Sequence, residues 1–437
     1  MFWLLYNLIF VPVYLLLIPR FFWRMWRRGG YRKDFGQRFG IYRPPVRERL
    51  AGGGRVWVHA VSVGEVGLAL RFMAAWRERA DSGQADPVQF VLSVTTSTGS
   101  SVALEHSHSD DVSIYFPVDT PWVVKRVLDL VRPRAIIMVE QEFWPNMLRH
   151  CRKRGIPSAL VNGRISDRSF PRYMKARFAT RRVLPLIDRC IVQTQQDAER
   201  IQAMGAPADH VVVIPSMKYG TVVQPEPSAV DAARLVLRET GLADKPTLVA
   251  GSIWPGEFAA VARAGMDCGF SVVLVPRHFE RADVAQRELA ELGLRSRLRT
   301  EGAKEADVLV VNTTGEMMVW YALADAVFVG KSLPSATGKG GQNLIEPAAL
   351  GKAVVVGPNM RNFPGVMQDF SAADAVLVAE DPRAPMSLSE AFALVADPAR
   401  AVAMGERAKA VVENNANSLQ RTVDELLRLT ANVSPTA

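Results

Sequence analysis

Trp57-Val-His-Ala-Val-Ser-Val-Gly-Glu65 is the stretch that decides the fold, because an apolar strand ends there at Ser62 and Gly64 and delivers a carboxylate into a helix start. A strand, a tight turn and a helix in this order are typical of α/β proteins, which keep reactive side chains at the carboxyl ends of their strands. Glu65 is therefore our candidate for the residue that carries the chemistry. The alternative is an ordinary acidic residue in a first helical turn, where a carboxylate interacts favourably with the helix dipole.

Short apolar runs of the same kind recur along the chain and alternate with longer amphipathic segments. The candidate strands are residues 56–60, 89–94, 112–116, 135–140, 158–162, 189–193 and 210–214, followed by 247–250, 271–275, 308–311, 326–329, 353–356 and 375–378. Near-continuous apolar strands separated by helices predict parallel sheets that are covered on both faces. The predicted fold class is therefore α/β, with two Rossmann-like domains.

The chain is longer than one hydrophobic core usually organises. Its 437 residues fit two domains of about 180 residues each. Residues 219–245 lose β character and gather prolines, which indicates a linker. We therefore expect a first domain over residues 25–218 and a second over residues 246–437, which ends in amphipathic helices.

The amino-terminal segment is apolar and is followed by basic residues. Residues 2–18 carry no charge, and seven Arg and Lys residues against one Asp lie between positions 20 and 38. This length suits a membrane helix, and the basic flank places the following domains on the cytoplasmic side. We expect residues 1–24 to form a single membrane anchor. The alternative is a helix lying on the membrane surface, which Pro12, Pro19 and the aromatic residues favour.

The overall charge indicates anionic partners. Lys and Arg number 53 against 44 Asp and Glu, a net charge of +9, which suits nucleic acid, a phospholipid surface or a phosphorylated substrate. The three cysteines, Cys151, Cys190 and Cys268, lie far apart and have no His or Cys at ligand spacing. A disulfide framework and a zinc site are therefore not expected.

Polar residues follow several strands of the first domain. Glu140-Gln-Glu142-Phe-Trp-Pro-Asn146 places two carboxylates directly after a strand, where they can accept hydrogen bonds from sugar hydroxyls. Arg164 and Arg168 follow the next strand among hydroxyl side chains, an arrangement suited to a phosphate or carboxylate. With Ser62, these are our candidate acceptor or donor-sugar residues. A solvated loop is the alternative.

The second domain carries a comparable set. Arg277 follows a strand, and Thr337-Gly-Lys-Gly-Gly341 is a Gly-rich loop that leads into a helix containing Glu346. The amides of such loops can approach a phosphate, although the spacing matches neither the P-loop nor the dinucleotide fingerprint. We expect Arg277 and the loop amides to bind phosphate and Glu346 to bind ribose hydroxyls.

Six motifs in order resemble one family, the 3-deoxy-D-manno-octulosonic acid (Kdo) transferases of lipopolysaccharide synthesis. They are His59-Ala-Val-Ser-Val-Gly-Glu65, Glu140-Gln-Glu-Phe-Trp-Pro-Asn146, Asn162-Gly-Arg-Ile-Ser166, Pro276-Arg-His278, Gly315-Glu-Met317, and Gly340-Gly-Gln-Asn343 through Glu346-Pro-Ala348. The resemblance implies a GT-B architecture, in which two Rossmann-like domains face a cleft. It also implies that the second domain holds the donor CMP-Kdo and the first holds a lipid A precursor.

The resemblance assigns roles residue by residue. The family's general base falls on Glu65. Its CMP contacts fall on Pro276, Arg277, Gly315, Glu316, Met317, Asn343, Leu344, Ile345 and Glu346. No metal ligand and no cofactor are implied.

Four positions depart from the family pattern. The usual Gly-Asn-Leu-Lys-Phe-Asp reads Pro215-Ser-Met-Lys-Tyr-Gly220, and the usual His before Asn343 is Gln342. The second Gly of Val-Gly-Gly-Ser is Lys331, and the His expected after Ala-Gly-Ser is replaced near Trp254. These departures affect the donor and acceptor pockets more than the fold.

The predicted function is thus inverting transfer of Kdo from CMP-Kdo to a lipid A precursor resembling lipid IVA. The expected location is the cytoplasmic face of the cell inner membrane, with the anionic inner leaflet as a partner and no nucleic acid. One alternative is a UDP-sugar-dependent GT-B transferase acting on another lipid. The other is a catalytically silent anchored binding protein.

Overall fold

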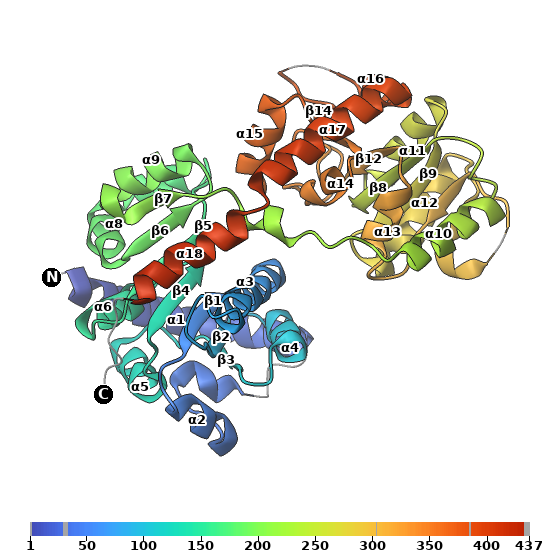
Figure 1. The fold of residues 1–437 in the computed structure, drawn as a ribbon. Coiled ribbons are helices and arrows are strands. Elements are labelled where there is room, and N and C mark those ends of the chain that lie inside the picture. The colour runs from blue at the N-terminus through green and yellow to red at the C-terminus, as the bar shows by residue number, and fades with distance from the viewer. Residues whose placement is uncertain (1, 29–33, 303, 384–385, 432–437) are drawn as a thin grey trace. The chain divides into compact units, whose positions relative to one another are not determined.

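The computed structural model describes residues 2–28, 34–302, 304–383 and 386–431. The chain divides into two compact units (Figure 1). Unit 1 comprises Met1–Thr221 with Asn417–Ala437, and unit 2 comprises Val222–Ala416. Each unit contains one seven-stranded sheet, and all the strand pairs are parallel.

Unit 1 is built around the sheet β3-β2-β1-β4-β5-β6-β7. Its strands are β1 (Val56–Ala60), β2 (Phe90–Val94), β3 (Val112–Tyr115), β4 (Ala135–Val139), β5 (Ser158–Gly163), β6 (Arg189–Val192) and β7 (Val211–Val213). Its helices include α2 (Pro44–Ala51), α3 (Val63–Asp81), α4 (Ser97–His106), α5 (Pro121–Val131), α6 (Pro145–Lys153), α7 (Phe170–Lys175), α8 (Arg177–Val183) and α9 (Gln195–Met204). The chain moves outward from β1 to β3 and then returns to place β4 on the other side of β1. The loops after β1 and β4 therefore flank the topological switch point, where open α/β sheets bind ligands.

Unit 2 repeats this plan with the sheet β10-β11-β9-β8-β12-β13-β14. Its strands are β8 (Thr247–Ile253), β9 (Ser271–Pro276), β10 (Ser296–Leu298), β11 (Val308–Val310), β12 (Ala326–Val329), β13 (Ala353–Val356) and β14 (Leu377–Val378). Its helices are α10 (Pro227–Glu239), α11 (Phe258–Asp267), α12 (Ala282–Glu291), α13 (Met317–Leu323), α14 (Ile345–Ala349), α15 (Pro364–Ala372), α16 (Leu388–Ala396) and α17 (Pro398–Asn415). The switch point lies between β8 and β12.

The α/β class and the two parallel sheets are confirmed, and every predicted strand is present with small shifts at its ends. The strand β10 was not predicted, because it has three residues, all half-buried, with Arg297 at its centre. Helix α10 lies in the segment expected to be a linker and belongs to unit 2.

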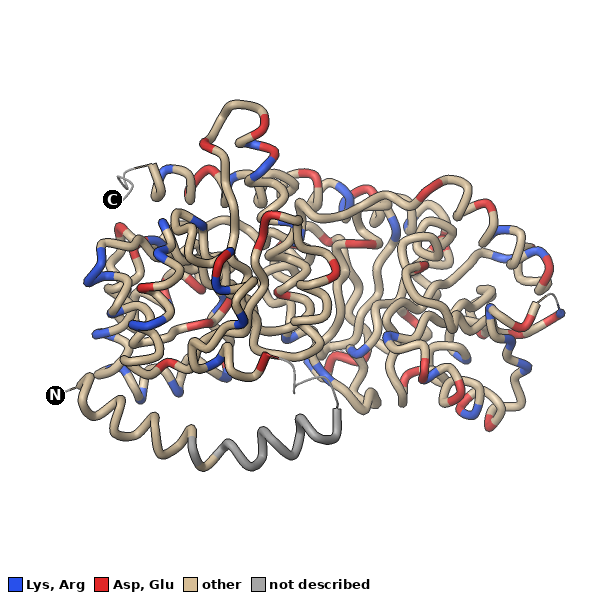
Figure 2. Tube along the Cα trace, turned by 90° about the horizontal axis from the view of Figure 1, so that it is seen from below, with Lys and Arg blue, Asp and Glu red and all other residues tan. Residues whose placement is uncertain are grey.

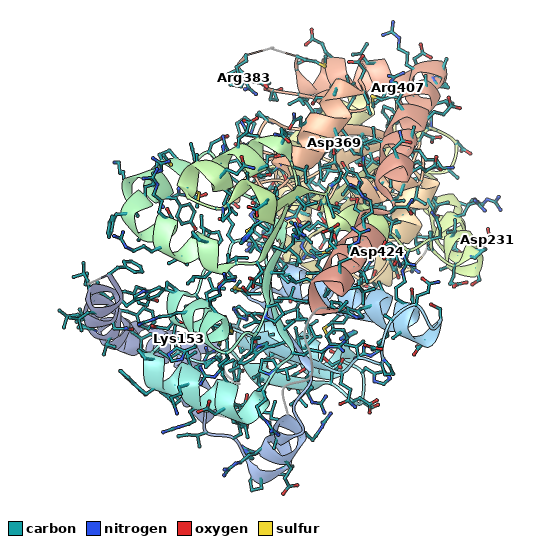
Figure 3. All side chains as sticks on the ribbon, turned by 60° about the vertical axis from the view of Figure 1, so that its left-hand side comes forward. Lys153, Asp231, Asp369, Arg383, Arg407 and Asp424 are labelled. Carbon is teal, nitrogen blue, oxygen red and sulfur yellow. The ribbon has the colours of Figure 1, made fainter. Side chains whose placement is uncertain are left out.

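The last helix, α18 (Ser418–Ala431), belongs to unit 1, although we expected residues 246–437 to form the second domain. Leu419, Val423 and Leu426 are buried in the core of unit 1. Asp424, labelled in Figure 3, lies 3.2 Å from the Arg79 guanidinium on α3. Amphipathic periodicity predicts a helix correctly, but it does not say which sheet the apolar face will cover.

The first helix, α1 (Phe2–Arg28), packs on unit 1 through one face. The Tyr6 hydroxyl donates to Asp119 Oδ2 at 2.9 Å, and Asn146 Nδ2 donates to Asn7 Oδ1 at 2.7 Å. The opposite face exposes the large aliphatic side chains Leu4, Leu5, Leu8, Ile9, Val13 and Leu16. In Figure 2 the part of this helix that is drawn in tan carries neither acidic nor basic residues.

Among the helices that the structure describes, none is both long enough and apolar enough to cross a membrane. The expectation that residues 1–24 span the bilayer is therefore not supported. Helix α1 extends beyond the uncharged residues 2–18 to Arg28 and so includes Arg20, Arg24 and Arg27.

Candidate active site

Glu65 lies at the start of α3, directly beyond β1. Its backbone N–H donates to Ser62 Oγ at 3.3 Å, while the Ser62 hydroxyl donates to Glu65 Oε1 at 2.7 Å. The Val61 N–H donates to the other carboxylate oxygen at 2.9 Å. These bonds form a capping arrangement. Glu65 therefore does stabilise the start of its helix, as the alternative interpretation of its sequence position expects. Burial nevertheless raises the pKa of Glu65, and the residue stands beside the switch point.

Glu140 and Glu142 follow β4, which is the neighbour of β1. Since His59 pairs with Met138 across the two strands, the loops that follow them share one edge of the sheet. Burial and the negative charge of Glu65 together raise the pKa of Glu142 to about 7. Glu140 lies 3.7 Å from Lys218. Three carboxylates thus gather at this edge, and one of them is half protonated near neutral pH.

His59 is a member of this group that our sequence assignment of site residues missed. Its Nδ1 lies 3.1 Å from both the carbonyl oxygen and the hydroxyl of Ser93. That hydroxyl donates to the Val58 carbonyl, so both groups act as acceptors and Nδ1 carries the proton. Nε2 then presents a lone pair. It has no hydrogen-bond partner among the described residues and lies 3.8 Å from Glu142 Oε2.

The His59 ring is buried against aromatic side chains, which exclude solvent from it. It stacks on Phe116 with ring centroids 3.8 Å apart, and Trp144 lies at 6.3 Å. Burial lowers the pKa of His59 to about 3, which keeps the imidazole neutral. A neutral lone pair attracts a protonated carboxyl and repels an ionised one. His59 therefore favours the protonated form of Glu142.

The predicted sugar-binding residues around this group are placed unevenly. Ser62 contacts Glu65 directly. Gln141, between the two carboxylates, donates to the Arg164 carbonyl and so joins this loop to the one after β5. Arg168 is exposed in the turn before α7, and within the described part of the chain it forms no hydrogen bond or ion pair with the carboxylates. The structure thus brings Ser62, Glu140, Glu142 and the Arg164 loop to one edge of the first sheet. Arg168 is not joined to this group by such contacts.

The predicted CMP residues all follow strands of unit 2. Pro276 ends β9, and the exposed Arg277 donates its backbone N–H to the Ile253 carbonyl at 3.1 Å. Gly315 has φ +83°, a conformation that glycine adopts without strain. It precedes Glu316, which accepts from Trp320 Nε1 at 3.1 Å. Met317 begins α13.

The remaining CMP residues lie at the start of α14. Asn343 Nδ2 donates to Glu346 Oε1 at 3.1 Å, while Asn343 Oδ1 accepts the Ile345 N–H at 3.3 Å. Leu344 and Ile345 are buried, so they can offer a ligand their backbone only. This set lies at the carboxyl edge of the second sheet. In the described part of the chain, no cluster of His, Cys, Asp and Glu is placed to hold a metal ion.

Comparison with known proteins supports the resemblance. Residues 33–221 match the family model described as 3-deoxy-D-manno-octulosonic-acid transferase (kdotransferase). A 3-deoxy-D-manno-octulosonic acid transferase of Bordetella pertussis is 34% identical over 434 residues, covering 94% of this chain and 96% of that protein. The Haemophilus influenzae enzyme of the same name is 26% identical over 411 residues, covering 91% of each.

Solved structures support the architecture. A Rickettsia africae glycosyltransferase covers 88% of this chain and 100% of its own, with a TM-score of 0.57 and 13% identity. The Anabaena protein HepE in complex with UDP and glucose covers 86% and 99%, with a TM-score of 0.54 and 13% identity. At such low identity these likenesses show the fold alone, which is GT-B.

The family follows from the sequence relatives instead. The Bordetella match extends over nearly the whole of both chains, and the family model covers the segment that contains Glu65, Glu140 and Glu142. The chain therefore belongs to the 3-deoxy-D-manno-octulosonic acid transferase family and is a glycosyltransferase.

Proposed function

We propose that this enzyme transfers Kdo from CMP-Kdo to a lipid A precursor, with inversion at the anomeric carbon. The observation that carries the proposal is the pairing of two carboxyl groups with different environments at the switch point of unit 1. Glu65 receives donors from Val61 and Ser62, which stabilise its ionised form. Glu142 instead meets the His59 lone pair and the Glu65 charge. When the environments of two carboxyl groups separate their pKa values, the group that stays ionised can act as the base and the protonated group as the proton donor.

Glu65 is the base in this assignment. An inverting transfer needs a carboxylate to take the proton from the attacking acceptor hydroxyl as the anomeric carbon becomes oxocarbenium-like. Two neighbouring carboxylates resist ionising together, so a neutral Glu142 leaves the negative charge on Glu65. The neutral Glu142 keeps an O–H group that can donate to a sugar oxygen.

The residues of unit 2 bind the donor. Arg277 is exposed and can pair with the CMP phosphate, whose charge grows as the sugar leaves; fixed cations stabilise such charge well. The Gly-rich loop of residues 337–341 adds backbone amides. Glu346, oriented by Asn343, accepts the ribose hydroxyls.

The acceptor lipid fits a protein at the surface of the inner membrane, on its cytoplasmic side. Tyr6 and Asn7 fix α1 to unit 1, so its aliphatic face points outward and can lie in the interfacial layer. Residues 168–187 contain six Arg and Lys residues and no Asp or Glu. Within this unit the Arg182 guanidinium also lies over the Phe2 ring of α1. A basic surface beside an aliphatic helix suits an anionic leaflet.

Mass spectrometry of a lipid A precursor incubated with CMP-Kdo and the purified enzyme tests the function. The expected product is heavier by the mass of Kdo, and CMP is released. Transfer from a UDP-sugar, with none from CMP-Kdo, would replace the proposed donor. Binding of CMP-Kdo without any product would make the chain a silent binding protein.

The base is tested with Glu65→Gln. Glutamine also serves in capping boxes, so α3 should stay formed while basicity is lost. We expect turnover to fall about a hundredfold or more, with CMP binding unchanged by calorimetry. Glu390→Gln is the matched control, because Glu390, like Glu65, lies in the first turn of its helix and is hydrogen-bonded to the N-cap serine, here Ser387. Equal turnover of the two variants would remove Glu65 from the mechanism.

The pH dependence of kcat/KM tests Glu142. Its pKa is about 7, so the proton is present below that pH and is lost above it. Activity should therefore fall as the pH rises through about 7. Glu142→Gln cannot ionise, and whatever activity remains in this variant should lack the alkaline fall. The same fall in both proteins would assign it to another group.

Calorimetry with CMP, 2′-deoxy-CMP and cytidine tests the donor residues. Glu346→Ala should leave ribose hydroxyls unpaired and cost about 1 to 3 kcal/mol of CMP affinity. Removing the 2′-hydroxyl should then weaken the wild type more than the variant. Arg277→Ala should weaken CMP and spare cytidine, which has no phosphate. Equal losses for every ligand in both variants would contradict the assignment.

Flotation with anionic lipid vesicles tests the membrane surface. Leu4 and Leu8 are 75% and 69% exposed, so changing both to Ser should leave the fold intact. Each buried Leu contributes about 1.5 to 3 kcal/mol, and the double variant should bind vesicles at least about tenfold more weakly. Leu104→Ser on α4, also 69% exposed, is the control. Equal binding by all three proteins would exclude α1 as the contact.

A further inference from the structure

Two of the positions at which this chain departs from its family contact each other. Trp254 follows β8, and Lys331 follows β12, the neighbouring strand across the switch point of unit 2. The Lys331 ammonium lies 4.9 Å from the centroid of the Trp254 ring. This distance is within the range of a cation–π interaction. The two departures therefore form one structural unit, which we call the Lys331–Trp254 pair.

The backbone of Lys331 is held in a strained conformation. Its φ is +60°, in the left-handed region that glycine adopts freely and that costs other residues about 1 to 2 kcal/mol. The buried Glu257 carboxylate accepts the N–H of Lys331 at 2.6 Å and that of Trp254 at 3.0 Å. One carboxylate thus fixes both partners of the pair. Strain that is fixed in this way is typical of ligand-binding positions.

Further basic groups surround the indole. The Arg281 guanidinium lies 4.8 Å from the ring centroid of Trp254, and the His278 ring lies at 5.4 Å. Burial lowers the pKa of His278, and so do the charges of Arg277, Arg281 and Lys331, against the single acid Glu280. Cations this close repel one another, and a bound anion would relieve that repulsion.

The Gly-rich loop packs directly on the pair. A Cβ at Gly338 would lie 2.8 Å from Trp254 Nε1 and 3.2 Å from Lys331 Cε. The Gly341 N–H donates to the Lys331 carbonyl at 2.9 Å. The loop expected to approach the donor phosphate therefore rests against the ammonium and the indole.

We propose that the Lys331–Trp254 pair is a specificity site that binds an anionic oxygen of the donor. The proposal rests on the proposed function and extends it to residues that the family pattern does not supply. CMP-Kdo offers such an oxygen on its phosphate and on the sugar carboxylate. Lys331 contributes a compact, rotatable charge, and Trp254 fixes the position of that charge. Glu257 is a positioning residue, because it acts through the backbone of both.

Lys331→Met and Lys331→Gly test the pair. Met keeps the aliphatic stem and removes the charge, whereas Gly also relieves the backbone strain. We expect both variants to raise KM for CMP-Kdo about tenfold or more. Lys331→Gly should do so without lowering the melting temperature. Lys245→Met is the matched control, because Lys245 is an exposed lysine that precedes β8, outside the residues assigned to donor binding, and its removal changes the net charge equally.

Calorimetry with CMP and cytidine identifies the anionic group. Weaker CMP binding with unchanged cytidine binding assigns Lys331 to the phosphate. Unchanged CMP binding with a raised KM for CMP-Kdo assigns it to the sugar carboxylate. In a Trp254→Leu background the effect of Lys331→Met should shrink, because the ring no longer holds the ammonium.

Wild-type values for Lys331→Met with both CMP and CMP-Kdo would overturn the proposal, as would an equal loss in Lys245→Met. Failure of the proposed function looks different. In that case wild-type enzyme would show no transfer from CMP-Kdo, and Arg277→Ala would bind CMP as the wild type does.

Discussion

A carboxylate placed just beyond the first strand of each parallel sheet organises the loops around it. In unit 2, Glu257 follows β8, is fully buried, and accepts backbone N–H groups from Trp254, Lys331, Ser332 and Leu333. Such charge-assisted bonds are strong, and a buried carboxylate depends on them. The loops after β8 and β12 are therefore fixed together. In unit 1, Glu65 occupies the corresponding place after β1 with fewer donors and partial exposure. A carboxylate in the same place thus holds two loops together in unit 2 and is a candidate base in unit 1. The difference is that Glu257 is fully buried whereas Glu65 is partly exposed.

The positions of the strands could be predicted in large part from the sequence, since strands such as β1 and β8 are short and mostly apolar runs. The partners of the terminal helices could not be predicted. The apolar face of α18 could pack on either sheet as far as its sequence shows. The burial of Val423 and Leu426 in the core of unit 1 shows which sheet it covers. The uncharged start of α1 suggested a bilayer span. The hydrogen bonds of Tyr6 and Asn7 instead join one face of that helix to the protein, and periodicity does not reveal such bonds.

The candidate site shows the same limit. Glu65 and Glu142 could be found because each directly follows a strand that ends at the switch point. The raised pKa of Glu142 could not be foreseen, because it comes from burial and from the charge of Glu65 in the folded unit, and the position of the proton on the neutral His59 ring adds to this effect. Ser93, on a strand some 30 residues later in the chain, fixes that proton through two acceptors on Nδ1. The consequence is a lone pair facing Glu142, and no local pattern around His59 encodes it.

The departures from the family pattern are consistent with this view of the site. Alone, a lysine at a left-handed backbone position is unfavourable, and the loss of the histidine expected near Trp254 removes a titratable ring. Together, Lys331 and Trp254 contact each other on loops fixed by Glu257, so each substitution makes sense only in the presence of the other. The permanent charge of Lys331 then lies beside the place where the family pattern has a titratable histidine. With a lysine at this site, binding of an anionic donor would depend less on pH than it would with a histidine there. The pH dependence of the reaction would then come from Glu142 in unit 1.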